Sequence, residues 1–127
     1  MESNKNVLDD FGKLVVNNIY DDGINYFTQL KNNQTKWGTG KEYTDVFNKL
    51  NEIDKLTLQN YVDQTIRTTI FGFLGIFEEN ENFKIIFEEN GKQINLVEIS
   101  EMLKSEPIGE NGWIARFSKV VDRDQII

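Results

Sequence analysis

The stretch from Leu56 to Phe77 constrains the fold most, because it is the longest segment whose apolar residues follow a helical period. Apolar side chains recur there every three or four residues, which is the spacing of one helical face. Thr57 can cap the first turn, with Asp54 as an alternative start. The pattern predicts a central helix with inward positions Leu58, Tyr61, Val62, Ile66, Ile70, Phe73, Leu74 and Phe77.

The second half of this stretch, residues 70–77, has no polar face, so other parts of the chain or a partner must cover it on nearly all sides. A buried strand is the alternative for this half, but its continuity with the periodic half favours a helix. Gly72 and Gly75 each cost a helix roughly 1 kcal/mol relative to alanine, which indicates a close approach of another backbone. We therefore expect Phe73 to be buried and Phe73→Ala to cost roughly 3–5 kcal/mol.

Composition predicts one folded domain with little catalytic chemistry. The chain has 127 residues, 39% of them hydrophobic, and we expect about residues 5–120 to form an ordered core. It contains no Cys and no His, which excludes disulfides, thiolate metal sites, cysteine nucleophiles and the commonest general base. We therefore expect no metal and no cofactor, and an enzyme is the less favoured class.

The net charge of −7 argues against nucleic acid as a partner, because nucleic-acid binding needs Lys and Arg to neutralise phosphates. Such acidity is normal for solubility, but it also suits a protein partner with a basic surface. The chain shows neither a targeting segment at its start nor an apolar run of membrane-spanning length. A cytoplasmic protein is the expectation.

Two further helices are predicted before the central one. Residues 5–31 form one long amphipathic pattern, which either crosses the central helix closely at Gly23 or breaks there. Residues 32–42 read as a loop, in which Trp37 either covers the core edge or serves as an exposed binding anchor. Residues 43–53 then give a helix of about three turns.

The clearest local signal is a β-hairpin centred on Asn90-Gly91, which suits a type I′ turn because both positions need positive φ. Counting outward pairs Glu89 with Lys92, Phe87 with Ile94, and Ile85 with Leu96. The alternation of residues 113–117 predicts a third strand against the same core. The expected fold is α+β: three helices, the apolar one at the centre, packed against a small antiparallel sheet of the hairpin and a C-terminal strand.

Carboxylates are the remaining candidates for catalysis. The adjacent pairs are Asp9-Asp10, Asp21-Asp22 and Glu78-Glu79, but neighbouring residues on a helix point in different directions, so none is by itself a facing pair. Gly38-Thr39-Gly40-Lys41 fails the phosphate-loop motif, and residues 78–89 fail the calcium-loop motif at the position that must be Gly.

The terminal segment Gly112 to Ser118, together with Glu78 and Glu79, resembles small bacterial proteins of an uncharacterised family in which a closing Gly-Trp-Ile-x-Arg-Phe-Ser segment recurs. The resemblance spans about residues 8–119. That family has no assigned activity, so the resemblance implies no function.

The candidate binding residues are Trp37, Glu110, Trp113 and Arg116. Arg116 could receive a carboxylate, or could form an internal salt bridge that ties the last strand to the helices. The favoured hypothesis is a non-catalytic protein-binding or accessory protein, comparable to small bacterial immunity proteins. The alternative is a carboxylate-dependent hydrolase or small-ligand binder with a pocket between the third helix and the sheet, and a homodimer is a further hypothesis.

Overall fold

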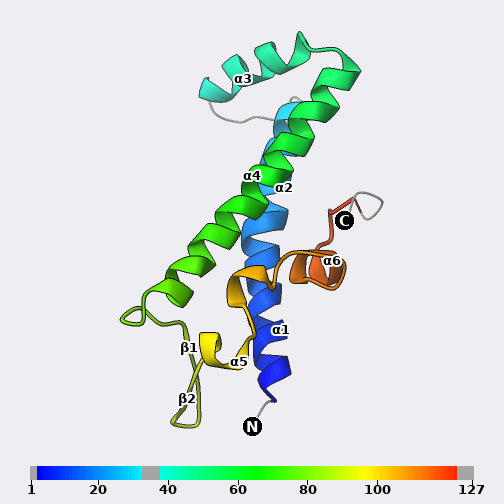
Figure 1. Cartoon of the computed structure of the whole chain (residues 1–127). Helices are drawn as coiled ribbons and strands as arrows, with labels where there is room; N and C mark the ends of the chain where they lie inside the picture. The colour runs from blue at the N-terminus through cyan, green and yellow to red at the C-terminus, as the bar shows by residue number, and fades with distance from the viewer. Residues whose placement is uncertain (1–2, 33–37, 123–127) are drawn as a thin grey trace.

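The N-terminal part of the chain is one continuous helical run. The computed structural model describes residues 3–32 and 38–122. In it α1 (Asn4–Val15), the π-helix η1 (Val16–Asp21) and α2 (Asp22–Lys31) follow one another without a break (Figure 1). Ser3 caps the start by accepting a hydrogen bond from the backbone N–H of Asn6. The prediction of one long helix through Gly23 is confirmed, and Gly23 lies against the Ile66 side chain of α4.

The chain then returns through α3 (Gly38–Asn48) and α4 (Glu52–Glu79), and Figure 1 shows α4 running back across the first helices with α3 at its far end. The predicted boundaries were shifted. α3 begins and ends about five residues earlier than expected, and α4 begins at Glu52 because Asn51 caps it, accepting a hydrogen bond from the backbone N–H of Asp54.

The hairpin is confirmed in turn and register. Strands β1 (Ile86–Glu89) and β2 (Lys92–Asn95) pair antiparallel, with Phe87 opposite Ile94 and Glu89 opposite Lys92. Asn90 and Gly91 have φ values of 53° and 80°, as a type I′ turn requires. Beyond the strands, the backbone N–H of Leu96 donates to the carbonyl of Ile85, which extends the predicted pairing.

The predicted third strand is wrong. Residues Trp113–Phe117 form the short helix α6, preceded by α5 (Leu96–Ile99) and the 3₁₀ helix η2 (Leu103–Ser105), so the sheet in the described residues has two strands. Trp113 and Ile114 are both fully buried. In a strand, neighbouring side chains point to opposite faces of the sheet, so one of the two would be exposed in a two-layer fold. The fold is α+β as expected, but α5 and α6 add to the three long helices and make the predicted helix count wrong.

The core lies between the first helical run, the later part of α4 and the segment that follows the hairpin. α4 packs against η2, and α6 packs against α1 and η1. Within the described residues, no helix has the length and apolar character needed to cross a membrane. The core side chains are Val7, Leu8, Val15, Val16, Tyr20, Ile70, Leu74, Leu96, Leu103, Trp113 and Ile114.

The second half of α4 is covered on one side only, which corrects the expectation for residues 70–77. Ile70, Leu74 and Gly75 are buried, but the side chain of Phe73 is 55% exposed. A Cβ added to Gly72 would meet no atom within 4 Å, so no other backbone approaches there. The expected cost of 3–5 kcal/mol for Phe73→Ala is therefore wrong, because that range applies to buried phenylalanines.

Candidate functional site

Trp113, one of the predicted binding residues, is a core residue. Its side chain is fully buried and meets the ring of Phe11 edge to face, with centroids 5.8 Å apart. It also lies on Gly12, where an added Cβ would come within 2.6 Å of the indole. Its indole N–H finds no acceptor among the described residues. The structure therefore makes Trp113 the contact that seats α6 on α1.

Arg116 fastens the same contact from outside. Its Nη1 lies 3.0 Å from an Asp9 carboxylate oxygen, and its Nε donates to the carbonyl of Asn111 at 2.8 Å. This is the internal salt bridge that the sequence offered as the alternative. Glu110 is exposed in the loop before α6, and Trp37 lies outside the described residues. A binding role for these four residues stays a prediction.

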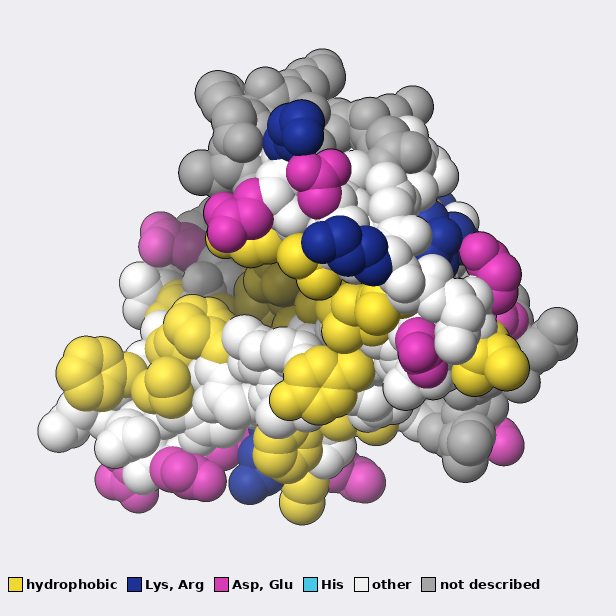
Figure 2. All heavy atoms as spheres, turned by 90° about the horizontal axis from the view of Figure 1, so that it is seen from above, with side chains coloured by type: hydrophobic (Ala, Val, Ile, Leu, Met, Phe, Trp, Pro, Cys, Tyr) yellow, Lys and Arg dark blue, Asp and Glu magenta, His cyan; other side chains and the backbone are white. Residues whose placement is uncertain are grey.

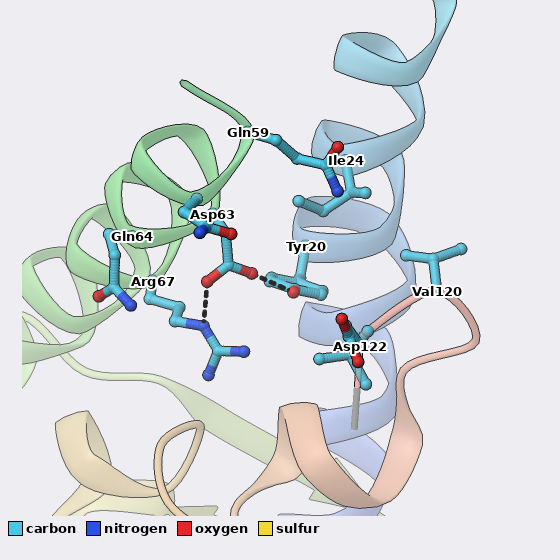
Figure 3. Close-up of a pocket in the computed structure, with 10 residues that line it drawn as sticks. Tyr20, Ile24, Gln59, Asp63, Gln64, Arg67, Val120 and Asp122 are labelled. Atoms are coloured by element: carbon cyan, nitrogen blue, oxygen red, sulfur yellow. Dashed lines mark hydrogen bonds and ion pairs between the residues drawn. The ribbon is translucent and has the colours of Figure 1, made fainter. Parts of the chain in front are cut away.

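A polar pocket lies between α4 and the η1–α2 part of the first helical run (Figure 3). Its volume is about 410 Å³. The predicted alternative placed a ligand pocket between the third helix and the sheet, whereas this pocket opens against η1 and the chain that follows α6. We call it the polar pocket, and its lining residues are Tyr20, Ile24, Gln59, Asn60, Asp63, Gln64, Arg67, Val120, Val121 and Asp122.

Tyr20, Asp63 and Arg67 form a hydrogen-bonded network at one wall of the polar pocket (Figure 3). The Tyr20 hydroxyl donates to one oxygen of Asp63, and Arg67 Nε donates to the other at 2.8 Å. The guanidinium also lies over the Tyr20 ring, 5.3 Å from its centroid. Burial of Tyr20, followed by its hydrogen bond to Asp63, raises the pKa of the phenol well above its ordinary value, so the phenol keeps its proton and donates to Asp63 up to a higher pH than an exposed tyrosine would.

The π-helix positions both this network and the facing wall of the pocket. Tyr20 enters the network, while its neighbour Asp21 is buried and accepts hydrogen bonds from the Ser118 hydroxyl at 2.6 Å and the Lys119 backbone N–H at 3.0 Å. The Ser118 oxygen in turn accepts the backbone N–H groups of Val120 and Val121. The π-helix is rare and occurs frequently at functional sites. Here two adjacent residues of it organise opposite sides of one pocket.

A second hollow has the opposite character. It lies between α1–η1 and the second half of α4, and its volume is about 560 Å³. Leu14, Ile19 and Phe73 are exposed along it. We call it the apolar groove. Its lining comprises Phe11, Leu14, Val15, Ile19, Ile70, Phe73 and Leu74 with two polar residues, Asn18 and Thr69.

The α3 end of the molecule also exposes apolar side chains. Figure 2 looks onto this end and shows hydrophobic side chains gathered around a hollow, with acidic groups beside it. Tyr43 and Val46 of α3 and Ile53, Leu56 and Tyr61 of α4 are all more than half exposed. Uncovered apolar side chains therefore lie at both ends of α4.

Sequence reasoning did not identify either hollow as a site. The i,i+4 spacing of Asp63 and Arg67 is typical of an ion pair on the exposed face of a helix, whereas the Asp63 and Arg67 side chains are only 24% and 15% exposed. Nothing in the sequence of the first helical run singles out Tyr20. Only the crossing of α4 over η1 brings these three side chains together.

Within residues 3–32 and 38–122, no group of three or more acidic side chains could hold a metal ion. The chain matches no protein-family model, and no curated protein and no solved structure is significantly similar to it.

Proposed function

We propose that this chain is a non-catalytic accessory protein of the cytoplasm that binds another protein through the apolar groove. The observation that carries the proposal is the exposure of Leu14 (61%), Ile19 (45%) and Phe73 (55%) along one hollow. Folded monomeric domains rarely expose large contiguous apolar patches. Where such a patch occurs, it often marks an interaction site. These three side chains do not belong to the core cluster, although Val15, Ile70 and Leu74 at the base of the groove do.

The shape of the groove favours a helix as its occupant. The groove runs between two helices, and the apolar side chains that border it recur at helical spacing on both of them. An amphipathic helix could place its apolar face between these two helices and bury their exposed apolar side chains. An extended peptide would need a free strand edge, and β1 and β2 do not line this hollow.

Charge favours a basic partner helix. Asp10 lies one helical turn before Leu14, and Asp22 lies one helical turn after Asn18. Both side chains are exposed and flank the groove on the first helical run. Residues 78–110, which continue from the end of α4, carry nine acidic and three basic side chains. Lys or Arg on the polar face of a partner helix would be attracted by Asp10 and Asp22 and by the net charge of −7, which accelerates association and disfavours acidic competitors.

The test uses two labelled helical peptides with the same Leu-rich face, one with Lys and one with Glu on the polar face. Fluorescence anisotropy should show binding of the basic peptide, weakening with added salt, and little binding of the acidic one. Leu14→Glu should weaken the basic peptide by about tenfold or more, which corresponds to about 1.4 kcal/mol. Val46→Glu on α3 is the matched control, since Val46 is 58% exposed and lies outside the groove.

Two results would contradict the proposal. One is equal affinity for the two peptides, and the other is equal loss with Leu14→Glu and Val46→Glu. Light scattering at several concentrations tests whether a second copy covers the groove instead. A dimer that becomes monomeric only in Leu14→Glu would replace the heterologous partner with a homodimer.

A further inference from the structure

We propose that the polar pocket binds a small, singly charged carboxylic acid that carries hydroxyl or amide groups, with its carboxylate on the Nη1 and Nη2 atoms of Arg67. This site is separate from the apolar groove and does not depend on the function proposed for it. The two hollows use different stretches of α4, residues 59–67 for the pocket and 69–74 for the groove.

Arg67 is held as a fixed donor with unused capacity. Its Nε is engaged by Asp63, which Tyr20 holds in turn, and the Tyr20 ring supports the guanidinium face. Its ion pair with Asp63 uses Nε, and Tyr20 makes a further side-chain hydrogen bond to Arg67, so the remaining N–H groups of the guanidinium can serve a ligand although the side chain is only 15% exposed. A guanidinium edge held in this way matches the two oxygens of a carboxylate.

The charge balance of the pocket selects a monoanion. Among the described residues that line it, Asp63 and Asp122 are acidic and Arg67 is basic. Asp122 lies on the far side of the hollow from Arg67 in Figure 3. Because Asp63 already pairs with Arg67, a bound carboxylate adds one negative charge next to these acidic side chains, whereas a phosphate dianion would add two and meet stronger repulsion.

The other lining residues define the body of the ligand. Gln59, Asn60 and Gln64 present carboxamides, each able to donate and accept hydrogen bonds, along the α4 side. Ile24, Val120 and Val121 supply apolar surface around the rest of the hollow. A volume of about 410 Å³ lies within the usual range of roughly 300–1,000 Å³ for small-molecule sites. Hydroxyl or amide groups on a short carbon chain would form hydrogen bonds with these carboxamides.

The first experiment titrates the wild-type protein with gluconate and N-acetylglycine while side-chain N–H signals are followed by NMR. Sorbitol and N-acetylglycinamide are the neutral controls, and inorganic phosphate is the dianion control. Saturable shifts of the Arg67 signals and of the three carboxamides are expected with an acid and not with the controls. Absence of saturable shifts with both acids at millimolar concentration overturns the proposal, and phosphate binding as strongly as the acids overturns the monoanion assignment.

The second experiment compares two variants that each remove one positive charge from α4. Arg67→Gln should weaken binding of the acid by about tenfold or more. Lys55→Gln should leave it unchanged, because Lys55 pairs with Glu52 and does not line the pocket. Equal weakening in both variants would mean that recognition comes from overall charge. If Arg67→Gln fails to fold by circular dichroism, the wild-type titration still decides the outcome.

Discussion

The polar pocket and the apolar groove lie between the same two helical elements, yet they differ in how far the chain itself completes them. In the pocket, Tyr20, Asp63 and Arg67 are joined by hydrogen bonds and are mostly buried. In the groove, Leu14 and Phe73 are more than half exposed and find no cover within the described chain. α4 therefore changes character along its length, from a polar wall to an uncovered apolar one.

This difference separates two kinds of site. The network in the pocket is specified inside the fold, since each of the three side chains is held by another, and a ligand would find a preformed geometry. The groove offers exposed apolar surface without a fixed hydrogen-bonding geometry. This surface contributes to the free energy of binding only when another apolar surface covers it. Four variants test whether the two hollows differ in this way.

Leu74→Ala should have the largest effect on stability. Leu74 is 1% exposed and belongs to the core at the base of the groove. Its truncation leaves a cavity, so the free energy of unfolding should fall by about 2–5 kcal/mol in denaturant melts. A loss below about 1 kcal/mol would show that the base of the groove is as uncovered as its rim.

Asp63→Asn should have the next largest effect on stability. It removes the negative charge that holds Arg67, and it removes one of the two carboxylate oxygens that accept hydrogen bonds from Tyr20 and Arg67. We expect a loss of about 1–3 kcal/mol in the same melts, the cost of leaving a partly buried donor unsatisfied. Asp45→Asn in the exposed Lys41–Asp45 pair is the control and should change stability by less than about 1 kcal/mol. Equal effects would mean that the pocket network is no more than a surface ion pair.

Tyr20→Phe should alter the pH dependence of stability in alkali. The folded state raises the pKa of Tyr20, while an unfolded tyrosine ionises near about 10. The unfolded state therefore loses its proton first, so stability is retained below about pH 10 and falls as the pH rises above it. Unfolding free energies measured across this range should decline less steeply in Tyr20→Phe. Identical slopes would show that the folded state does not raise the pKa of Tyr20.

Phe73→Ala should have the smallest effect on stability, roughly 1 kcal/mol or less, because the side chain is exposed and its described ring contact is an edge-to-face pair with Phe77. The same variant should weaken the basic helical peptide. Melts and anisotropy on one sample check both statements. A stability loss as large as that of Leu74→Ala would mean that Phe73 is packed in solution and that the groove is closed.

Local sequence signals were sufficient where local physics decides the structure. Asn90-Gly91 requires positive φ at both positions, and the alternation around it sets the register, so the hairpin was predicted residue by residue. The apolar period predicts the long helices but not their ends. α3 begins at Gly38, before its periodic residues, and α4 begins after Asn51, which caps it ahead of Asp54 and Thr57.

The segment around Trp113 was misread because alternation over five residues is also compatible with one short helical turn. What decides between them is the surface available to it. Gly12 leaves room for the indole on α1, and Asp21 anchors Ser118 just beyond the helix. Both contacts join residues about a hundred positions apart, so no local pattern could reveal them.

The α+β class, the three long helices and the hairpin could be predicted without a structure, because they depend on periodicity and turn chemistry within short windows of the sequence. The packing of the helices against one another sets which side of α4 is covered, brings Tyr20 to Asp63 and Arg67, and leaves Phe73 exposed. The physical reason is that a helical period states which residues share a face. Whether that face meets the core, a pocket or solvent depends on where the other helices cross it.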